Sequence, residues 1–188
     1  MNNQAFIDGQ NLTLGTTLSD QPWKIDLFRF RKYLQERYNV TKAYYFIGCL
    51  DENLQDLYDM IQEAGFVLVF RAHGGSLVSH KKGNVDTDVV FTMMKNFHEY
   101  PDVDKFYLIS GDGDYYKTVK YLLDQGKLGK VLFPAHHKAS SLYHQNISGT
   151  YYDYLDYPDI KKKIQLENWH KENRGLRLGI SPFTLPSW

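Results

Sequence analysis

Short apolar runs alternate with longer stretches whose apolar residues recur at helical spacing, and this alternation constrains the fold more than any other feature. The apolar runs are too short for helices and predict buried strands. They lie at residues 4–7, 42–48, 66–70, 105–109 and 130–133, with 151–155 as a sixth strand or an extended edge. The helical patterns cover residues 23–38, 51–64, 85–97, 114–125, 139–145 and 158–169, whereas residues 10–23 are polar and turn-like. Each crossover can hold a helix, so we expect an α/β fold with a mostly parallel sheet of about five to six strands and helices on both faces.

The length and composition favour one packed domain with a short appendage. The chain has 188 residues, of which 43% are hydrophobic, and we expect a domain over residues 1–167. Residues 168–188 differ in kind and predict a tail that is extended or docks on the domain or on a partner subunit, so a homodimer is an open alternative.

Charge and cysteine content exclude several classes of protein. The net charge is zero, from 22 basic and 22 acidic residues, which argues against a broadly basic nucleic-acid binder and leaves room for a local basic patch. Cys49 is the single cysteine, so neither an internal disulfide nor a multi-cysteine metal site can form. We find neither a basic-then-apolar leader nor an apolar run of about 18 residues, and we expect a soluble, cytoplasmic protein without a membrane partner.

Acidic side chains follow two of the predicted strands. Asp8 ends the first strand, and Asp112 and Asp114 follow the fourth in the run Ser110-Gly111-Asp112-Gly113-Asp114. Ligands of open α/β sheets bind at the carboxyl edge, where neighbouring strands reverse their order. If the first and fourth strands are neighbours, these three carboxylates converge there.

Asp86 adds a fourth carboxylate from the start of the third predicted helix. Val90, Met93 and Phe97 follow it by four, seven and eleven residues, so all four share one helical face. Asp86 is therefore expected to point toward the sheet. Asp88 lies about 200° further round an ideal helix and ranks below Asp86.

Carboxylates forced together repel unless a cation neutralises them or some remain protonated. A site rich in oxygen and free of sulfur suits Mg²⁺ or Mn²⁺, which can activate water and stabilise charge developing on a phosphodiester. Each acid also has a structural alternative, because Asp8 could be a turn residue and Asp86 or Asp114 the N-cap of its helix.

Three motifs resemble those of a known family. They occur in the same order and at similar spacing in the LabA-like branch of the NYN family, within the PIN-like nucleases, and the similarity covers about residues 4–157. The motifs are Phe6-Ile7-Asp8-Gly9-Gln10-Asn11, Lys82-Gly83-Asn84-Val85-Asp86-Thr87-Asp88 and Ser110-Gly111-Asp112-Gly113-Asp114-Tyr115.

The resemblance implies a PIN-like fold with a metal-dependent ribonuclease centre. The acidic cluster that would bind Mg²⁺ or Mn²⁺ and carry catalysis is then Asp8, Asp86, Asp112 and Asp114. Asn11 and Ser110 would orient a metal ligand, a water or a phosphate. One residue is inserted before Asp86 relative to the family motif, so Asp86 and Asp88 both remain candidates for that position. Tyr115 stands where Phe is more usual.

Basic and aromatic residues are further candidates for contacts with RNA. The loop after the third strand carries the densest basic group in the chain, Arg71, His73, His80, Lys81 and Lys82. Arg71, Lys81 and Lys82 could hold a phosphate backbone, or simply be solvated. His136 and His137 follow the fifth strand at the same predicted edge and are either substrate contacts or an exposed turn. Tyrosines of the predicted strands could stack on bases or be half-buried packing residues, namely Tyr44, Tyr45, Tyr151, Tyr152 and Tyr154.

Our leading hypothesis is a hydrolase, a Mg²⁺- or Mn²⁺-dependent endoribonuclease that acts on single-stranded RNA. A non-catalytic RNA-binding or protein-interaction module is the main alternative. Clustered negative charge without metal would not help such a module to bind a polyanion. A metal-dependent phosphatase acting on small phosphate esters is a third hypothesis.

Overall fold

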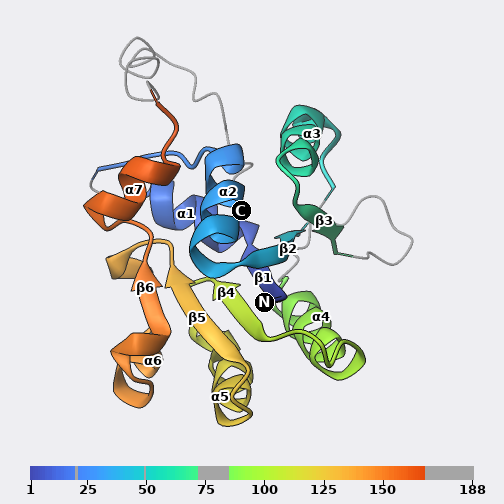
Figure 1. Cartoon of the computed structure of the whole chain (residues 1–188). Coiled ribbons are helices and arrows are strands. Elements are labelled where there is room, and N and C mark those ends of the chain that lie inside the picture. The colour runs from blue at the N-terminus through green and yellow to red at the C-terminus, as the bar shows by residue number, and fades with distance from the viewer. Residues whose placement is uncertain (20, 49, 72–84, 168–188) are drawn as a thin grey trace.

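The computed structural model of the chain describes residues 1–19, 21–48, 50–71 and 85–167. Six strands form one sheet in the order β3-β2-β1-β4-β5-β6, and every neighbouring pair is parallel (Figure 1). The strands are β1 Asn3–Asp8, β2 Val40–Ile47, β3 Val67–Phe70, β4 Lys105–Ile109, β5 Leu128–Phe133 and β6 Tyr152–Tyr154. The predicted α/β fold with a parallel sheet is confirmed.

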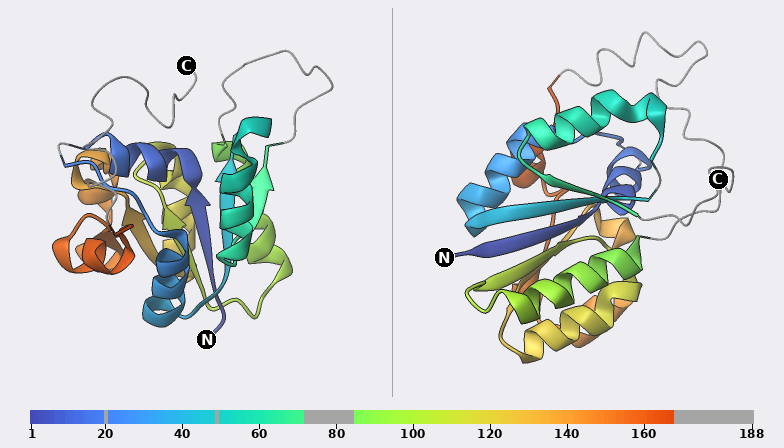
Figure 2. Two further views of the ribbon diagram at one scale, coloured as in Figure 1. Left: turned by 90° about the horizontal axis from the view of Figure 1, so that it is seen from above. Right: turned by 90° about the vertical axis from the view of Figure 1, so that its right-hand side faces the viewer.

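Helices cover both faces of this sheet, as Figure 2 shows. One face is covered by α1 Gly9–Thr17, α2 Leu27–Tyr38, α3 Gln55–Glu63 and α7 Pro158–Ile164. The other face is covered by α4 Asp86–Glu99, α5 Tyr116–Asp124 and α6 Ser141–Asn146. None of the helices in the described part of the chain is both long and apolar enough to span a bilayer.

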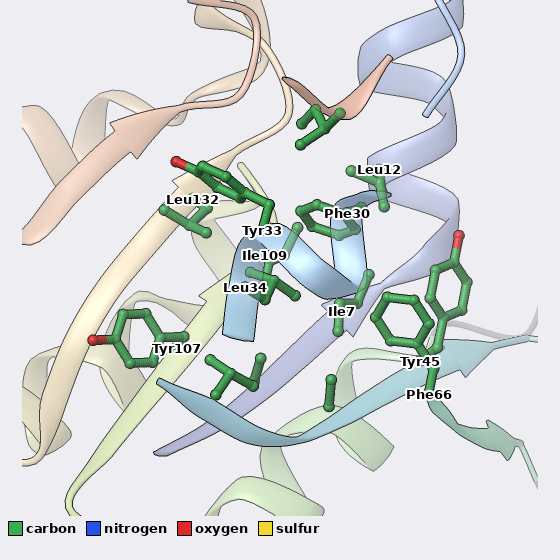
Figure 3. Packing of buried hydrophobic residues seen from close by; sticks show 14 of the residues in the cluster. Ile7, Leu12, Phe30, Tyr33, Leu34, Tyr45, Phe66, Tyr107, Ile109 and Leu132 are labelled. Atoms are coloured by element: carbon green, nitrogen blue, oxygen red, sulfur yellow. The ribbon is translucent and has the colours of Figure 1, made fainter. Parts of the chain in front are cut away.

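Two apolar cores, one on each face, hold the strands in place. Successive residues of β1 alternate between them, with Ala5 and Ile7 in one core and Phe6 in the other. Figure 3 shows Ile7 packed beside Phe30 of α2 and Ile109 of β4. Because both faces of β1 are buried, its register is tightly specified. Ile7 pairs with Ile109 of β4, so the residues that follow these two emerge together at the carboxyl edge.

The prediction of a turn-like segment over residues 10–23 is wrong in its first half, because α1 begins directly after β1. Asp8 caps this helix, its Oδ1 accepting the N–H of Asn11 at 2.9 Å. Leu12 is buried in the core, and the hydroxyl of Thr13 donates to the carbonyl of Gly9. Capping and packing on the sheet stabilise this polar helix, which has no strong apolar stripe to reveal it in the sequence.

Two other predicted helices have different bounds. The helix expected from residue 23 begins at Leu27, since the Asp26 side chain caps it by accepting the N–H of Arg29 at 3.0 Å. The helix expected to run to residue 169 ends at Ile164, and Gln165 then forms an antiparallel bridge with Ile25. The predicted tail over residues 168–188, with its docking or dimer role, lies outside the described residues.

Candidate metal centre

The site lies where the strand order reverses, at the carboxyl ends of β1 and β4. One side-chain hydrogen bond joins the two strand ends, and a second lies within the segment after β4. The Asn11 Oδ1 accepts the N–H of Gly111 at 2.9 Å, and the buried Ser110 Oγ accepts the N–H of Asp112 at 3.1 Å. Both predicted polar partners therefore hold the backbone of the loop that carries Asp112.

The same loop is packed from its other side by the segment after β5. The N–H of Ser140 donates to the carbonyl of Gly111 at 2.9 Å, and the hydroxyl of Tyr143 donates to the carbonyl of Asp112 at 2.6 Å. A Cβ atom at position 111 would collide with the carbonyl oxygen of Lys138. Only glycine fits this close approach between two backbones.

Three carboxylates meet above this loop. Asp86 comes from the first turn of α4, and Asp112 and Asp114 follow β4. One oxygen from each lies within 4.8 Å of the others, with Asp86 and Asp112 half-buried and Asp114 exposed. Ligand oxygens on opposite sides of a Mg²⁺ ion are about 4.2 Å apart, so small side-chain rotations would let the three share one ion. The set of hard oxygen donors fits Mg²⁺ or Mn²⁺.

Asp112 has the capping role that the sequence suggested as an alternative for Asp114. Its Oδ1 accepts the N–H of Asp114 at 3.0 Å and caps the short 3-10 turn Gly113–Tyr115. This bond orients the Asp112 carboxylate without neutralising its charge. Capping and a share in the acidic cluster are therefore compatible in one side chain.

Asp8 reaches the cluster through the hydroxyl of Tyr115. This hydroxyl lies 3.0 Å from Oδ2 of Asp8 and 2.6 Å from Oδ1 of Asp86, so the two carboxylates share its single proton. Burial raises the pKa of the Asp8 carboxyl, and the charges of Asp86 and Asp112 raise it further, while the bonds from Asn11 and Tyr115 oppose the shift. Asp8 is thus the innermost acid of the site.

The sequence did not indicate where the Tyr115 hydroxyl lies in this site. Its side chain is fully buried, and burial together with the negative charge of Asp8 raises the pKa of its hydroxyl, which keeps its proton at neutral pH. The available signal was the tyrosine at a motif position where phenylalanine is more usual. Nothing local to residues 110–115 indicates that its hydroxyl lies between two acids from other elements.

The family model of the NYN domain matches residues 4–153 of this chain. The chain belongs to the NYN domain family. The resemblance to the NYN family is confirmed, and membership implies a nuclease-type hydrolase domain. A search of curated proteins found no match.

A solved structure shares the fold of this NYN domain. It is a protein of unknown function from Vibrio parahaemolyticus, 17% identical, with a TM-score of 0.70. The similarity covers 88% of this chain and 96% of the other. At that identity the likeness supports the fold alone.

The structure distinguishes the two acids at the start of α4. Within the described residues, the acidic group that could hold an ion contains Asp86, and Asp88 is not part of it. Val89 and Met93 are buried on α4, and Asp86 contacts the buried Tyr115 hydroxyl. Asp86 therefore faces inward, as its spacing predicted.

The basic candidates are only partly described. Lys81 and Lys82, with His73 and His80, fall outside the described residues. Arg71 directly follows β3, and its N–H donates to the carbonyl of Ile47 at 3.1 Å.

The other candidates divide into exposed and buried side chains. His136 and His137 are exposed on the 3-10 turn His136–Lys138. The base-stacking alternative is wrong for Tyr44 and Tyr45, whose rings are buried in the two cores.

Proposed function

We propose that this NYN domain is a Mg²⁺- or Mn²⁺-dependent endoribonuclease that cleaves single-stranded RNA. The observation that carries the proposal is the convergence of Asp86, Asp112 and Asp114 from two separate elements at the switch point of an NYN-family sheet. NYN membership supports RNA as the substrate. Clustered carboxylates would repel RNA phosphates, and a bound cation removes that repulsion.

The chain's own residues would hold and orient the site. Asp86, Asp112 and Asp114 are the proposed ligands, with Asp8 behind them as the innermost acid. A divalent ion bound there supplies an activated water and stabilises negative charge on the phosphodiester. Tyr115 fixes Asp86 relative to Asp8, and we assign to Arg71, Lys81 and Lys82 the contacts with RNA phosphates that their charge favours.

The test is cleavage of an internally labelled single-stranded RNA in Mn²⁺, with and without chelator. Asp112→Asn keeps the shape of the side chain and should lower the rate at least about 100-fold, since even residues behind a metal ligand cost 10- to 100-fold when changed. Asp88→Asn is the matched control and should cleave at the parent rate. A circular RNA substrate separates internal cutting from digestion of ends.

Four outcomes would contradict the proposal. Asp112→Asn could cleave as fast as the parent, cleavage could persist in chelator, or the protein could hydrolyse a small phosphate ester while sparing RNA. The last result would make the domain a phosphatase. Binding of RNA in chelator without any cleavage in Mn²⁺ would instead identify a non-catalytic module.

A further inference from the structure

Two rings beside the acidic site form a rigid parallel stack, made of His136 after β5 and Tyr154 at the end of β6. Their ring centroids are 3.8 Å apart and their planes differ by 3°. The His136 side chain is 51% exposed although its conformation is fixed. Asp156 fixes it, since Oδ2 accepts the His136 N–H at 3.0 Å and Oδ1 lies 2.7 Å from Nδ1. The Tyr154 ring is fixed too, with its hydroxyl 2.6 Å from Nε2 of His144.

The outer face of His136 is not covered by the third ring of this group, Tyr157. The centroid of Tyr157 lies 4.8 Å from His136 and 5.2 Å from Tyr154, while those two rings are 3.8 Å apart. By the law of cosines, the directions from His136 to Tyr154 and from His136 to Tyr157 diverge by about 73°. Tyr157 therefore stands beside the stack, at 70° to the His136 ring, and not over the face opposite Tyr154.

This geometry is what a nucleobase needs. Every base has a flat π-face, and stacking on an exposed ring contributes to binding with little regard to sequence. A ring already held in one conformation loses little entropy when a ligand packs on it. Bases inside a duplex have their faces covered by neighbouring bases, whereas those of a single strand are accessible.

The stack also lies next to the proposed catalytic residues. His136 is two residues from Lys138 in the chain, so their Cα atoms are at most about 7 Å apart. The backbone of Lys138 lies directly against Gly111, and Ser140 is bonded to the carbonyl of Gly111. A nucleotide whose base rests on His136 would therefore have its phosphates close to Asp112 and Asp114.

We propose that the outer face of His136, backed by Tyr154, binds one base of single-stranded RNA beside the phosphate at the acidic cluster. The substrate class rests on the proposed ribonuclease function, but the binding step does not require cleavage. The stack would make the enzyme prefer unpaired RNA and would set where the scissile phosphate lies relative to a bound base.

The experiment is an abasic scan. Fluorescence anisotropy measures the affinity for a short single-stranded RNA and for copies with one nucleotide made abasic at each position in turn. Ca²⁺ replaces Mn²⁺, and a gel verifies that the RNA is intact. Stacking on an aromatic ring predicts about a tenfold loss for one abasic position, and the same loss for His136→Ala with the complete RNA. In His136→Ala the abasic penalty at that position should disappear.

Two further variants control for folding and charge. His136→Phe retains a flat ring and the backbone bond to Asp156, loses only the contact of the ring with Oδ1, and should keep the position-specific penalty. His98→Ala removes another exposed histidine, on the last turn of α4, and should bind like the parent. Thermal unfolding checks that each variant is folded.

The proposal is overturned if His136→Ala binds the complete RNA as tightly as the parent, or if its abasic penalties match those of the parent. It is also overturned if duplex RNA binds as well as single-stranded RNA, or if no RNA binds. The ribonuclease proposal fails separately if the abasic penalty depends on His136 as expected but Mn²⁺ supports no cleavage. Cleavage in Mn²⁺ together with an abasic penalty that does not depend on His136 would support the nuclease and overturn the base-binding site.

Discussion

Replacing Asp112 by Asn should raise the stability of the metal-free protein and abolish its stabilisation by Mn²⁺. The amide keeps the shape of the side chain and its carbonyl can still cap the N–H of Asp114, because Asn and Asp are equally good caps. The substitution removes one negative charge from the three carboxylates of Asp86, Asp112 and Asp114, which have oxygens within 4.8 Å of one another.

The magnitude follows from Coulomb's law. At 4.8 Å two unit charges repel by about 0.9 kcal/mol in water and by about 3.5 kcal/mol at an effective dielectric constant near 20. Asp114 is exposed, so its repulsion of Asp112 is near the lower value, and the half-buried Asp86 contributes somewhat more. We expect a gain of about 2 kcal/mol in the free energy of unfolding, or roughly 4–8 °C in melting temperature for a domain of this size.

The ion should stabilise the parent and not the variant. An ion at 100 times its dissociation constant adds about 2.7 kcal/mol to the parent, which is roughly 5–11 °C, and should add little to Asp112→Asn. Thermal unfolding followed by circular dichroism, in chelator and in Mn²⁺ at low salt and neutral pH, measures both terms. Asp88→Asn should retain the Mn²⁺ shift of the parent. The reasoning is refuted if Asp112→Asn melts no higher than the parent in chelator and gains as much from Mn²⁺.

Three other predictions test the surroundings of the cluster. Because the pKa of Asp8 is raised in the folded state, the unfolded state loses its proton first as pH rises above about 4. Metal-free stability should therefore fall with rising pH until the folded carboxyl also ionises. Urea unfolding across pH should show this fall in the parent and less of it in Asp8→Asn, and equal slopes in the two proteins would disprove it. Tyr115→Phe removes a hydrogen bond to charged groups and should lower the free energy of unfolding by about 1.5–3 kcal/mol in chelator, as measured by urea unfolding. An unchanged urea midpoint would mean that the hydroxyl between Asp8 and Asp86 contributes nothing to stability. Gly111→Ala places a methyl group against the carbonyl of Lys138 and should displace the loop that carries Asp112. Mn²⁺ should then raise the melting temperature of this variant less than that of the parent. An equal rise in the two proteins would rule this out.

Much of the fold was predictable because its strands are short apolar runs, and such a run can be recognised from neighbouring residues alone. The sequence left the adjacency of β1 and β4 as a condition for the convergence of the acids, and the sheet order meets that condition. Helix α1 was not predictable in this way. Its polar sequence becomes helical through the cap from Asp8 and the burial of Leu12 against the sheet, and both depend on where β1 lies.

The candidate site divides along the same line. The sequence by itself determined which carboxylates follow strands and that Asp86 shares the inward face of its helix, because these depend on spacing along one element. Only the tertiary structure decided that Tyr115 joins Asp8 to Asp86, that Lys138 packs on Gly111 and that His136 stacks on Tyr154. Those contacts join residues from different elements, and periodicity within one segment carries no information about the distance to another.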